Sequence, residues 1–172
     1  MFNYEKAFSR NIGWVTEEEQ QTLRGKKVAI AGAGGVGGVH LLTLARLGVE
    51  NFYISDFDDF EVHNFNRQSG AFMSTLGEQK VDVMQRMALD INPEANIKCF
   101  PEGIFEHNVD EFLEGVDLYV DALDFFALEA RKTVFKKCYE KNIPVITAAP
   151  LGMGAAFLCF MPGKMTYEEY FR

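Results

Sequence analysis

The chain has 172 residues, of which 48% are hydrophobic, and it carries a formal net charge of −8. This length suffices for one domain with a full core, no apolar run approaches the ~20 residues of a membrane span, and the mixed, charged N-terminus is unlike a signal peptide. The excess of acidic residues argues against general binding of nucleic acid, although it is compatible with a local basic pocket.

The three cysteines predict neither a zinc site nor a disulfide framework. Cys99, Cys138 and Cys159 are widely spaced and form no C-x-x-C pair. All three lie in apolar segments, so we expect buried, unreactive thiols. Reduced thiols of this kind fit a cytoplasmic protein.

The N-terminal segment is predicted to form a helical extension. Thr16 and Glu19 have the spacing of a capping box, which predicts a short helix over Glu17–Arg24. We therefore expect residues 1–25 to precede a nucleotide-binding domain that covers residues 26–172.

The stretch Lys27–Asp58 predicts a strand, a glycine turn, a helix and a second strand. The apolar run Val28–Ala31 is typical of a buried parallel strand. A helical pattern follows the turn and stops at Gly48. The apolar positions of that helix are Val39, Leu42, Leu44, Ala45 and Leu47. A second apolar run, Phe52–Ile54, leads into Asp56.

The glycine turn fits the G-x-G-x-x-G pattern. Its glycines are Gly32, Gly34 and Gly37, with Gly35 between them. Glycines let the backbone approach a phosphate closely, and the following helix offers N–H groups and a favourable dipole to an anion. Asp56 can then accept hydrogen bonds from a ribose hydroxyl. We expect a nucleotide here; the alternative is a merely tight turn.

The rest of the chain alternates between helices and strands. Helices are expected at residues 77–91, 108–113 and 125–141, and strands at residues 97–100, 118–120, 144–148 and 155–160. In the last helix, Leu128, Val134, Phe135 and Cys138 are expected to face inward. This alternation predicts an α/β, Rossmann-like fold with a doubly wound, mostly parallel sheet. The final letters, TYEEYFR, resemble the start of another element, so we expect the front part of a longer protein.

Polar side chains gather where the predicted strands end, which is where such folds bind ligands. They are Asp56, Asp58, Asn64, Arg67, Gln68, Lys80, Asp121 and Asp124. Several belong to the loop at residues 57–77, which lacks periodicity and is long enough to suggest a function. The aromatic residues of that loop argue that it is ordered.

The cations among these residues favour a nucleoside triphosphate. A triphosphate carries about four negative charges, which demand cations or a metal. Arg67 can grip phosphate oxygens bidentately, and Lys80 supplies a point charge. Lys80 is also expected at a helix start, where a cation is unfavourable unless an anion lies nearby. Asp124 or Asp121 can hold Mg²⁺, or cap the next helix. No G-K-[ST] follows the turn, so a P-loop is excluded.

Five motifs in register resemble the ThiF/MoeB/HesA family, the relatives of the ubiquitin-activating E1 adenylation domain. In chain order they are FSRNIG, GAGGVGG, DFDDFEVHNFNRQ, GEQK and DALD. The family pattern has Asn after DALD, where this chain has Phe125. That feature and the NFNRQ loop also resemble the tRNA threonylcarbamoyladenosine dehydratase branch.

The resemblance implies an ATP-dependent adenylyltransferase. By position, Asp56 is expected at the ribose, Asn64, Arg67 and Lys80 at the phosphates, and Asp124 at Mg²⁺. Arg10 is expected to act as an arginine finger in the site of a second subunit, which implies a homodimer. The expected reaction converts a carboxylate into an acyl-adenylate. Since a carboxylate is already ionised at neutral pH, no histidine base is required.

Several functions remain open from the sequence. The first is activation of the C-terminus of a ubiquitin-like or sulfur-carrier protein, and the second is activation of a tRNA-linked carboxylate. The net charge of −8 counts against tRNA. An NAD-dependent oxidoreductase and a non-catalytic nucleotide-binding regulator are the remaining alternatives.

Overall fold

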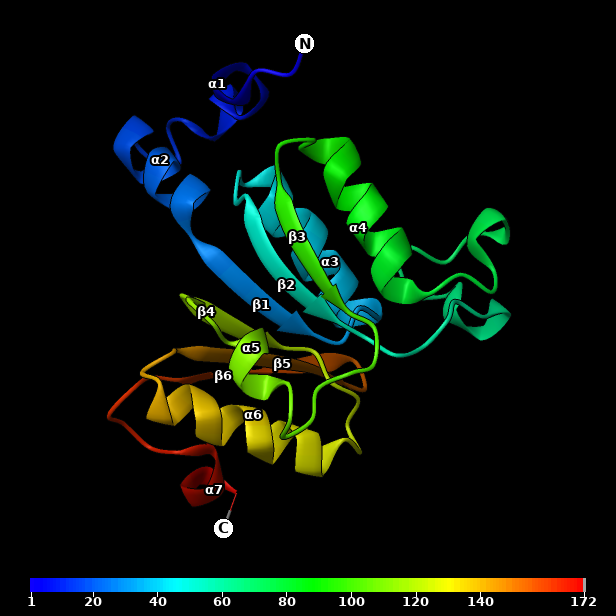
Figure 1. The fold of residues 1–172 in the computed structure, drawn as a ribbon, viewed down its shortest axis with the longest axis vertical. Coiled ribbons are helices and arrows are strands. Elements are labelled where there is room, and N and C mark those ends of the chain that lie inside the picture. The colour runs from blue at the N-terminus through cyan, green and yellow to red at the C-terminus, as the bar shows by residue number, and fades with distance from the viewer. Residues whose placement is uncertain (172) are drawn as a thin grey trace.

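Six strands form one sheet in the computed structural model, which describes residues 1–171 (Figure 1). The strands are β1 (Lys27–Ala31), β2 (Asn51–Ser55), β3 (Asn96–Phe100), β4 (Leu118–Asp121), β5 (Val145–Leu151) and β6 (Gly154–Phe160). The helices are α1 (Tyr4–Ala7), α2 (Glu17–Gly25), α3 (Gly35–Arg46), α4 (Lys80–Ile91), α5 (Val109–Phe112), α6 (Leu128–Glu140) and α7 (Tyr167–Tyr170). Residue 172, the last of the expected nucleotide-binding domain, lies outside the described part.

The strand order is β3-β2-β1-β4-β5-β6, and all neighbours are parallel except the pair β5 and β6. The order reverses between β1 and β4, and in such sheets the ligand crevice opens beyond the carboxyl ends of the strands at that point. The predicted Rossmann-like, mostly parallel fold with an N-terminal helical extension is confirmed.

Alternating side chains of β1 belong to two separate cores. Val28 and Ile30 pack in the core that includes Leu41 of α3 and Met84 of α4. Ala29 and Ala31 pack in the core on the other face, which includes Phe135 of α6. Because both faces of β1 are covered, this strand is apolar throughout, as parallel strands with helices on both sides are.

Two helices begin later than predicted. The segment before α6 forms a turn, so α6 begins at Leu128, and Leu128 is half exposed rather than inward. Val134, Phe135 and Cys138 are buried as predicted. Helix α4 begins at Lys80 because the backbone before it pairs with the base of the preceding loop.

The helical pattern after the glycine turn was only partly right. Ala45 is buried, but Val39 and Leu47 are exposed, and Leu41 fills the core instead. The small glycines at the start of α3 supply part of its buried face, and the apolar pattern does not register them.

The N-terminal segment is fastened to the carboxyl end of α3. The hydroxyl of Tyr4 donates to the Gly48 carbonyl at 2.6 Å, and the amide of Gln20 donates to the Leu47 carbonyl at 2.8 Å. Gly48 has φ +91°, and a Cβ there would lie 2.4 Å from the Tyr4 hydroxyl oxygen. Helix α1 was not predicted; α2 begins at the predicted residue, with the predicted capping box.

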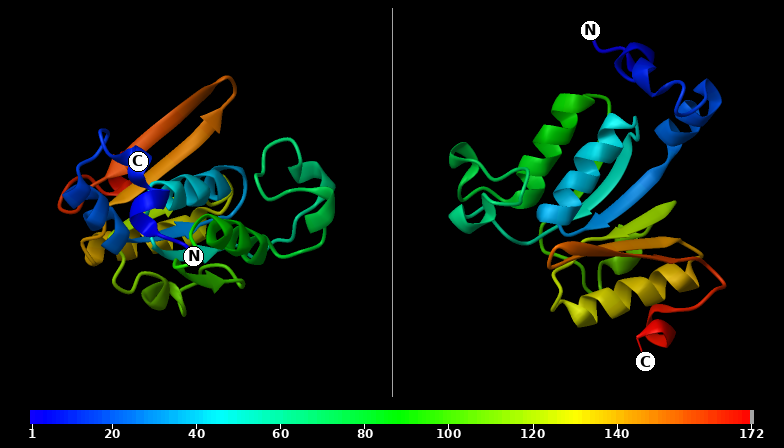
Figure 2. Two further views of the ribbon diagram at one scale, coloured as in Figure 1. Left: turned by 90° about the horizontal axis from the view of Figure 1, so that it is seen from above. Right: turned by 180° about the vertical axis from the view of Figure 1, so that it is seen from behind.

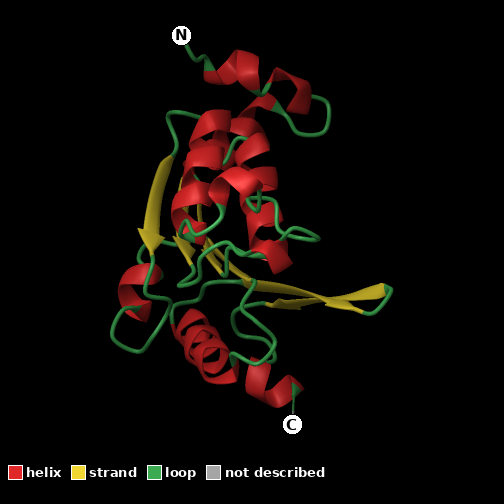
Figure 3. Ribbon diagram, turned by 90° about the vertical axis from the view of Figure 1, so that its right-hand side faces the viewer, coloured by secondary structure: helices red, strands yellow, loops and turns green. Residues whose placement is uncertain are grey.

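The β5–β6 hairpin projects from the body of the molecule (Figures 2 and 3). It carries exposed apolar side chains, among them Leu151, Met153 and Phe157. Within residues 1–171, no helix is both long and apolar enough to cross a membrane.

Candidate functional site

The glycine turn joins β1 to α3 and touches the turn that follows β4. Gly32 has φ +94°, and a Cβ there would lie 2.1 Å from the Ala122 carbonyl oxygen. At Gly37 a Cβ would lie 1.7 Å from the Gly32 carbonyl oxygen. Both positions therefore require glycine. Gly34 is the N-cap of α3 and has no side chain to offer, so the first N–H groups of the helix are open to an anion.

Asp56 follows β2 and braces this turn. One carboxylate oxygen accepts the Ala33 N–H at 2.7 Å, and the other accepts the Asp58 N–H at 2.9 Å. Burial raises the pKa of Asp56 above its ordinary value, and these two hydrogen bonds oppose the shift. Each oxygen keeps a second lone pair, so a ribose contact remains available to it.

The loop that follows is ordered, as its aromatic residues predicted. Its ends are joined by hydrogen bonds from the Phe60 N–H to the Glu78 carbonyl and from the Gly77 N–H to the Phe60 carbonyl, both 2.9 Å. The ring of Phe60 is fully buried. Asn64 is buried too, and its side-chain oxygen accepts the Glu61 N–H at 2.9 Å. The hydrogen bond that this side chain makes therefore shapes the loop.

Arg67 and Gln68 lie against the glycine turn. A Cβ at Gly35 would lie 3.4 Å from Cγ of Arg67, and a Cβ at Gly34 would lie 3.4 Å from Nε2 of Gln68. The guanidinium of Arg67 is exposed and donates to the His63 carbonyl and to the Asn66 side chain. Gln68 is 9% exposed, and among the described residues its Oε1 has no hydrogen-bond partner.

Lys80 is buried at the first position of α4 and pairs with Asp58. Its side chain is 6% exposed, and its Nζ lies 2.8 Å from Oδ2 of Asp58. The anion that offsets the unfavourable helix dipole in the structure is therefore Asp58. The position of Lys80 alone does not require a phosphate, although its link through Asp58 to Asp56 brings it to the edge of the glycine turn.

The two aspartates after β4 have different surroundings. Asp121 is 1% exposed, and its Oδ2 accepts from Nε of Arg131 at 2.9 Å and from the Thr147 hydroxyl at 2.8 Å. Asp124 is exposed, and its Oδ1 accepts the Phe126 N–H at 3.0 Å. Neither aspartate caps α6, whose N-cap residue is Ala127. That alternative was wrong because the turn before α6 extends to Ala127.

The donor set suits a cation that arrives with phosphates. In residues 1–171 no three His, Cys, Asp or Glu side chains gather into a metal site. Mg²⁺ is commonly held by one or two carboxylates together with substrate phosphates and water. Asp124, exposed and with one oxygen outside the turn's hydrogen bond, fits that role better than Asp121, whose oxygens already accept from neighbouring side chains.

Arg10 is remote from the glycine turn of its own chain. It is exposed in the short 3₁₀ turn Ser9–Asn11. Asn11 in that turn donates to the Leu47 carbonyl, beyond the carboxyl end of α3, whereas the glycine turn is at the amino end. The 12 residues of α3 separate the two ends, which corresponds to roughly 18 Å.

The cysteines do not contribute to this site. Burial raises the pKa of Cys99 to about 11 and that of Cys138 to about 12, as expected of unreactive thiols. The expectation that all three are buried is confirmed for Cys138 alone: Cys99 is half-buried, and Cys159 is exposed on the edge strand β6. Burial also lowers the pKa of His40, so its ring is neutral at pH 7.

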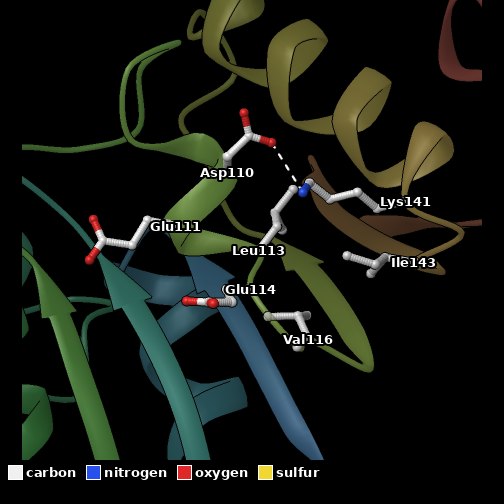
Figure 4. A pocket seen from close by; sticks show the side chains of 8 residues that line it. Asp110, Glu111, Leu113, Glu114, Val116, Lys141 and Ile143 are labelled. Atoms are coloured by element: carbon white, nitrogen blue, oxygen red, sulfur yellow. Dashed lines mark ion pairs between the residues drawn. The ribbon is translucent and has the colours of Figure 1, made fainter.

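A surface hollow of about 570 Å³ lies elsewhere (Figure 4). Its lining comes from α5, from the residues just before β4 and β5, and from Lys141, which pairs with Asp110. It therefore opens at the amino ends of β4 and β5, whereas the glycine turn follows the carboxyl end of β1. We assign it no part in the chemistry.

The fold and the glycine turn define a doubly wound α/β domain of the nucleotide-binding type. The model of the ThiF family matches residues 8–172, and the chain belongs to this family. The predicted family resemblance is thus confirmed.

Known relatives share this domain over most of the chain. At 37% identity over 150 residues, the chain is similar to tRNA threonylcarbamoyladenosine dehydratase of Bacillus subtilis (strain 168), over 87% of this chain and 57% of the relative. It is 27% identical over 143 residues to the sulfur carrier protein ThiS adenylyltransferase of Escherichia coli (strain K12), over 83% of this chain and 56% of the relative.

A solved structure shares the fold of this chain and was determined with ATP bound. The crystal structure of the E. coli tRNA N6-threonylcarbamoyladenosine dehydratase in complex with ATP superimposes with a TM-score of 0.79 and 27% identity, over 83% of this chain and 58% of that one. The chain therefore spans a little more than half the length of these relatives.

Proposed function

We propose that the protein uses ATP to activate a carboxylate as an acyl-adenylate. The observation that carries this proposal is the convergence on one glycine turn of three separate segments: the loop with Arg67 and Gln68, Asp56 after β2, and the turn after β4. Lys80 joins them through Asp58. ThiF-family membership and the ATP complex of a structural relative support the nucleotide.

In the proposed reaction a carboxylate oxygen attacks the α-phosphorus of ATP. The bond from the α-phosphorus to the bridging oxygen breaks, and pyrophosphate leaves with the electron pair. The acid is already ionised at neutral pH, so no proton has to be removed. The protein then has to position the reactants and neutralise charge, and we assign these tasks to the N–H groups of α3, Asn64, Arg67 and Lys80.

We further propose that Asp56 and Gln68 hold the nucleoside part, and that Asp124 holds Mg²⁺. When bound, the ion would neutralise phosphate charge. Asp58 is proposed to act on the nucleotide indirectly, as the partner of Lys80. An oxidoreductase has no evident need for a second cation, Arg67, beside the glycine turn, so this residue disfavours an NAD-dependent dehydrogenase.

Two acceptors remain as proposals. The 37% identity to a tRNA threonylcarbamoyladenosine dehydratase favours a carboxylate attached to a tRNA nucleoside. The match to a sulfur carrier protein ThiS adenylyltransferase keeps the C-terminal carboxylate of a carrier protein as the second candidate. The chain's acidic charge requires basic surface from elsewhere in the assembly if the acceptor is tRNA.

The test is AMP and pyrophosphate formation from ATP in the presence of each acceptor. We expect Lys80→Ala to lower turnover by about 100-fold or more, because a buried cation beside the reacting phosphates is lost. The matched control is Arg86→Ala, which removes another cation of α4 whose ion pair with Glu78 is exposed. Equal turnover of the Lys80→Ala variant and the wild type would refute the site. ATP binding without turnover on any acceptor would point to a regulatory domain.

A further inference from the structure

We infer that Arg131 is a positioning residue that holds the turn carrying Asp124 against the glycine turn. This residue was absent from the sequence-based site, and the inference rests on the proposed function for the role of Asp124. The hydrogen bonds by which Arg131 holds this turn, called the clamp below, are present in the structure without any nucleotide.

The guanidinium of Arg131 binds two ends of the same turn. Its Nε donates to Oδ2 of Asp121 at 2.9 Å. Its Nη2 donates to the carbonyls of Leu123 at 2.8 Å and Asp124 at 3.2 Å, and its Nη1 donates to the carbonyl of Phe125 at 3.3 Å. One planar group therefore holds a buried carboxylate and three consecutive backbone carbonyls, which the fixed fork of an arginine can do and a lysine cannot.

Asp121 makes this clamp rigid. Its carboxylate is 1% exposed, and Thr147 of β5 also donates to it, so it is tied to two strands of the sheet. Arg131 is itself only 12% exposed. The first turn of α6 has no side-chain cap, so capping does not hold the turn in its place.

The turn that Arg131 holds is in direct contact with the glycine turn. The absent Cβ of Gly32 would lie 2.1 Å from the Ala122 carbonyl oxygen and 3.1 Å from the Leu123 nitrogen. A shift of residues 122–124 therefore changes the position of the exposed Asp124 relative to the glycine turn. Removing a group that orients a metal ligand commonly lowers metal affinity or activity by about 10–100-fold.

The position of Arg131 in its helix supports a local role. It lies in the first turns of α6, where the macrodipole opposes a cation. Lys80 at the start of α4 raised the same conflict, and in both cases an aspartate at the carboxyl edge of the sheet resolves it.

The first experiment is hydrogen exchange on the nucleotide-free protein, comparing Arg131→Lys with the wild type. Arg86→Lys is the matched control, because Arg86 forms an exposed pair with Glu78. We expect exchange at residues 122–127 to accelerate at least tenfold in Arg131→Lys, with no change elsewhere and none in the control. Unchanged exchange in this turn would overturn the inference.

The second experiment measures the Mg²⁺ concentration that gives half-maximal turnover. We expect Arg131→Lys to raise it about 10-fold or more, with ATP affinity in the absence of Mg²⁺ within twofold of the wild type. A faster-exchanging turn with an unchanged Mg²⁺ requirement would overturn the link to Asp124. If the wild type binds no ATP, the proposed function fails, and the exchange experiment alone decides the role of Arg131.

A second variant covers the case in which Arg131→Lys does not fold. Removing Arg131 alone leaves a buried carboxylate without its ion pair, which is strongly destabilising. The double variant Asp121→Asn, Arg131→Met removes both charges while still freeing the three carbonyls. We expect it to fold and to show the same rise in Mg²⁺ requirement; a normal requirement would refute the clamp.

Discussion

Asp56 combines burial with two backbone hydrogen bonds, and burial is the larger influence on its pKa. Because the folded-state pKa is raised, protonation is favoured in the fold. The stabilising effect of the neutral form is therefore lost as pH rises through that pKa. In the ionised form Asp56 is instead ready to accept hydrogen bonds from a ligand.

We predict that ATP binding begins to weaken at a higher pH, as the pH falls, than it would if Asp56 had the pKa of an ordinary aspartate. Asp56→Asn should lower ATP affinity by roughly 10-fold at pH 7.5, since a charged acceptor is lost, and should abolish the acidic limb of the affinity profile. Its melting temperature should fall, because the carboxylate accepts two backbone N–H groups whereas the amide has one acceptor oxygen and turns its NH2 toward the other N–H. Calorimetric titration between pH 5 and 8 tests this, and an unchanged acidic limb in the variant would contradict it.

The cysteines give a second prediction at this scale. Cys159 is exposed, whereas burial raises the pKa values of Cys99 and Cys138 to about 11 and about 12. We expect a thiol reagent at pH 7.5 to modify Cys159 alone within minutes, and Cys159→Ser to remove that signal. Mass spectrometry of the labelled peptides decides the matter; fast labelling of Cys138 would show that the α6 core is not packed as described.

At the scale of elements, the glycine turn makes a sharp steric prediction. Gly37→Ala would place a Cβ 1.7 Å from the Gly32 carbonyl oxygen and so force α3 away from β1. We expect a loss of about 1–3 kcal/mol in stability and of at least 100-fold in ATP affinity. Gly25→Ala is the control, because nothing lies within 4 Å of its absent Cβ. Thermal unfolding and ATP titration measure both effects, and tight ATP binding by Gly37→Ala would refute this geometry.

The order and type of the main elements could be predicted because local patterns determine them. The apolar run of β1, the capping box of α2 and the periodicity of α4 all describe what each segment must bury. The boundaries of the helices could not be predicted as well from the sequence. The start of α6 depends on Arg131 holding the preceding turn, and that contact joins residues 123–125 to 131 in a geometry that no periodicity encodes.

The part of the site that local sequence patterns determine could also be predicted. The glycines and Asp56 are recognisable because the turn needs them wherever it occurs. The pairing of Asp58 with Lys80, and of Asp121 with Arg131, depends on which strand ends are adjacent across the sheet. A cation at a predicted helix start was the available signal for Lys80. The predicted helix over residues 125–141 places Arg131 well inside the helix, so only the later start of α6 in the structure shows the same signal there.

At the scale of the whole molecule, the distance between Arg10 and its own glycine turn leads to a prediction about assembly. If Arg10 acts in a second subunit, each site contains Lys80 from one subunit and Arg10 from its partner. Arg10→Ala and Lys80→Ala then each remove a residue that a different subunit supplies to that site. Mixing the two inactive variants should then restore roughly a quarter of wild-type turnover, because half the dimers are hybrid and each hybrid has one intact site. Light scattering should report the dimer, and a mixture that stays inactive although hybrid dimers form would refute the shared site.

The β5–β6 hairpin has a consequence for handling the protein. Only Val145–Thr147 of β5 pair with β4, so the outer part, from Ala148 opposite Phe157 to the tip, is a ribbon of two strands within the described chain. A lone two-stranded ribbon is marginally stable in water. Its tip should therefore fray without the rest unfolding, and a protease should nick it near Gly152 while the two cores stay intact. A subunit that packs over Leu151 and Phe157 would slow that cut, so the rate of nicking at the tip reports assembly directly.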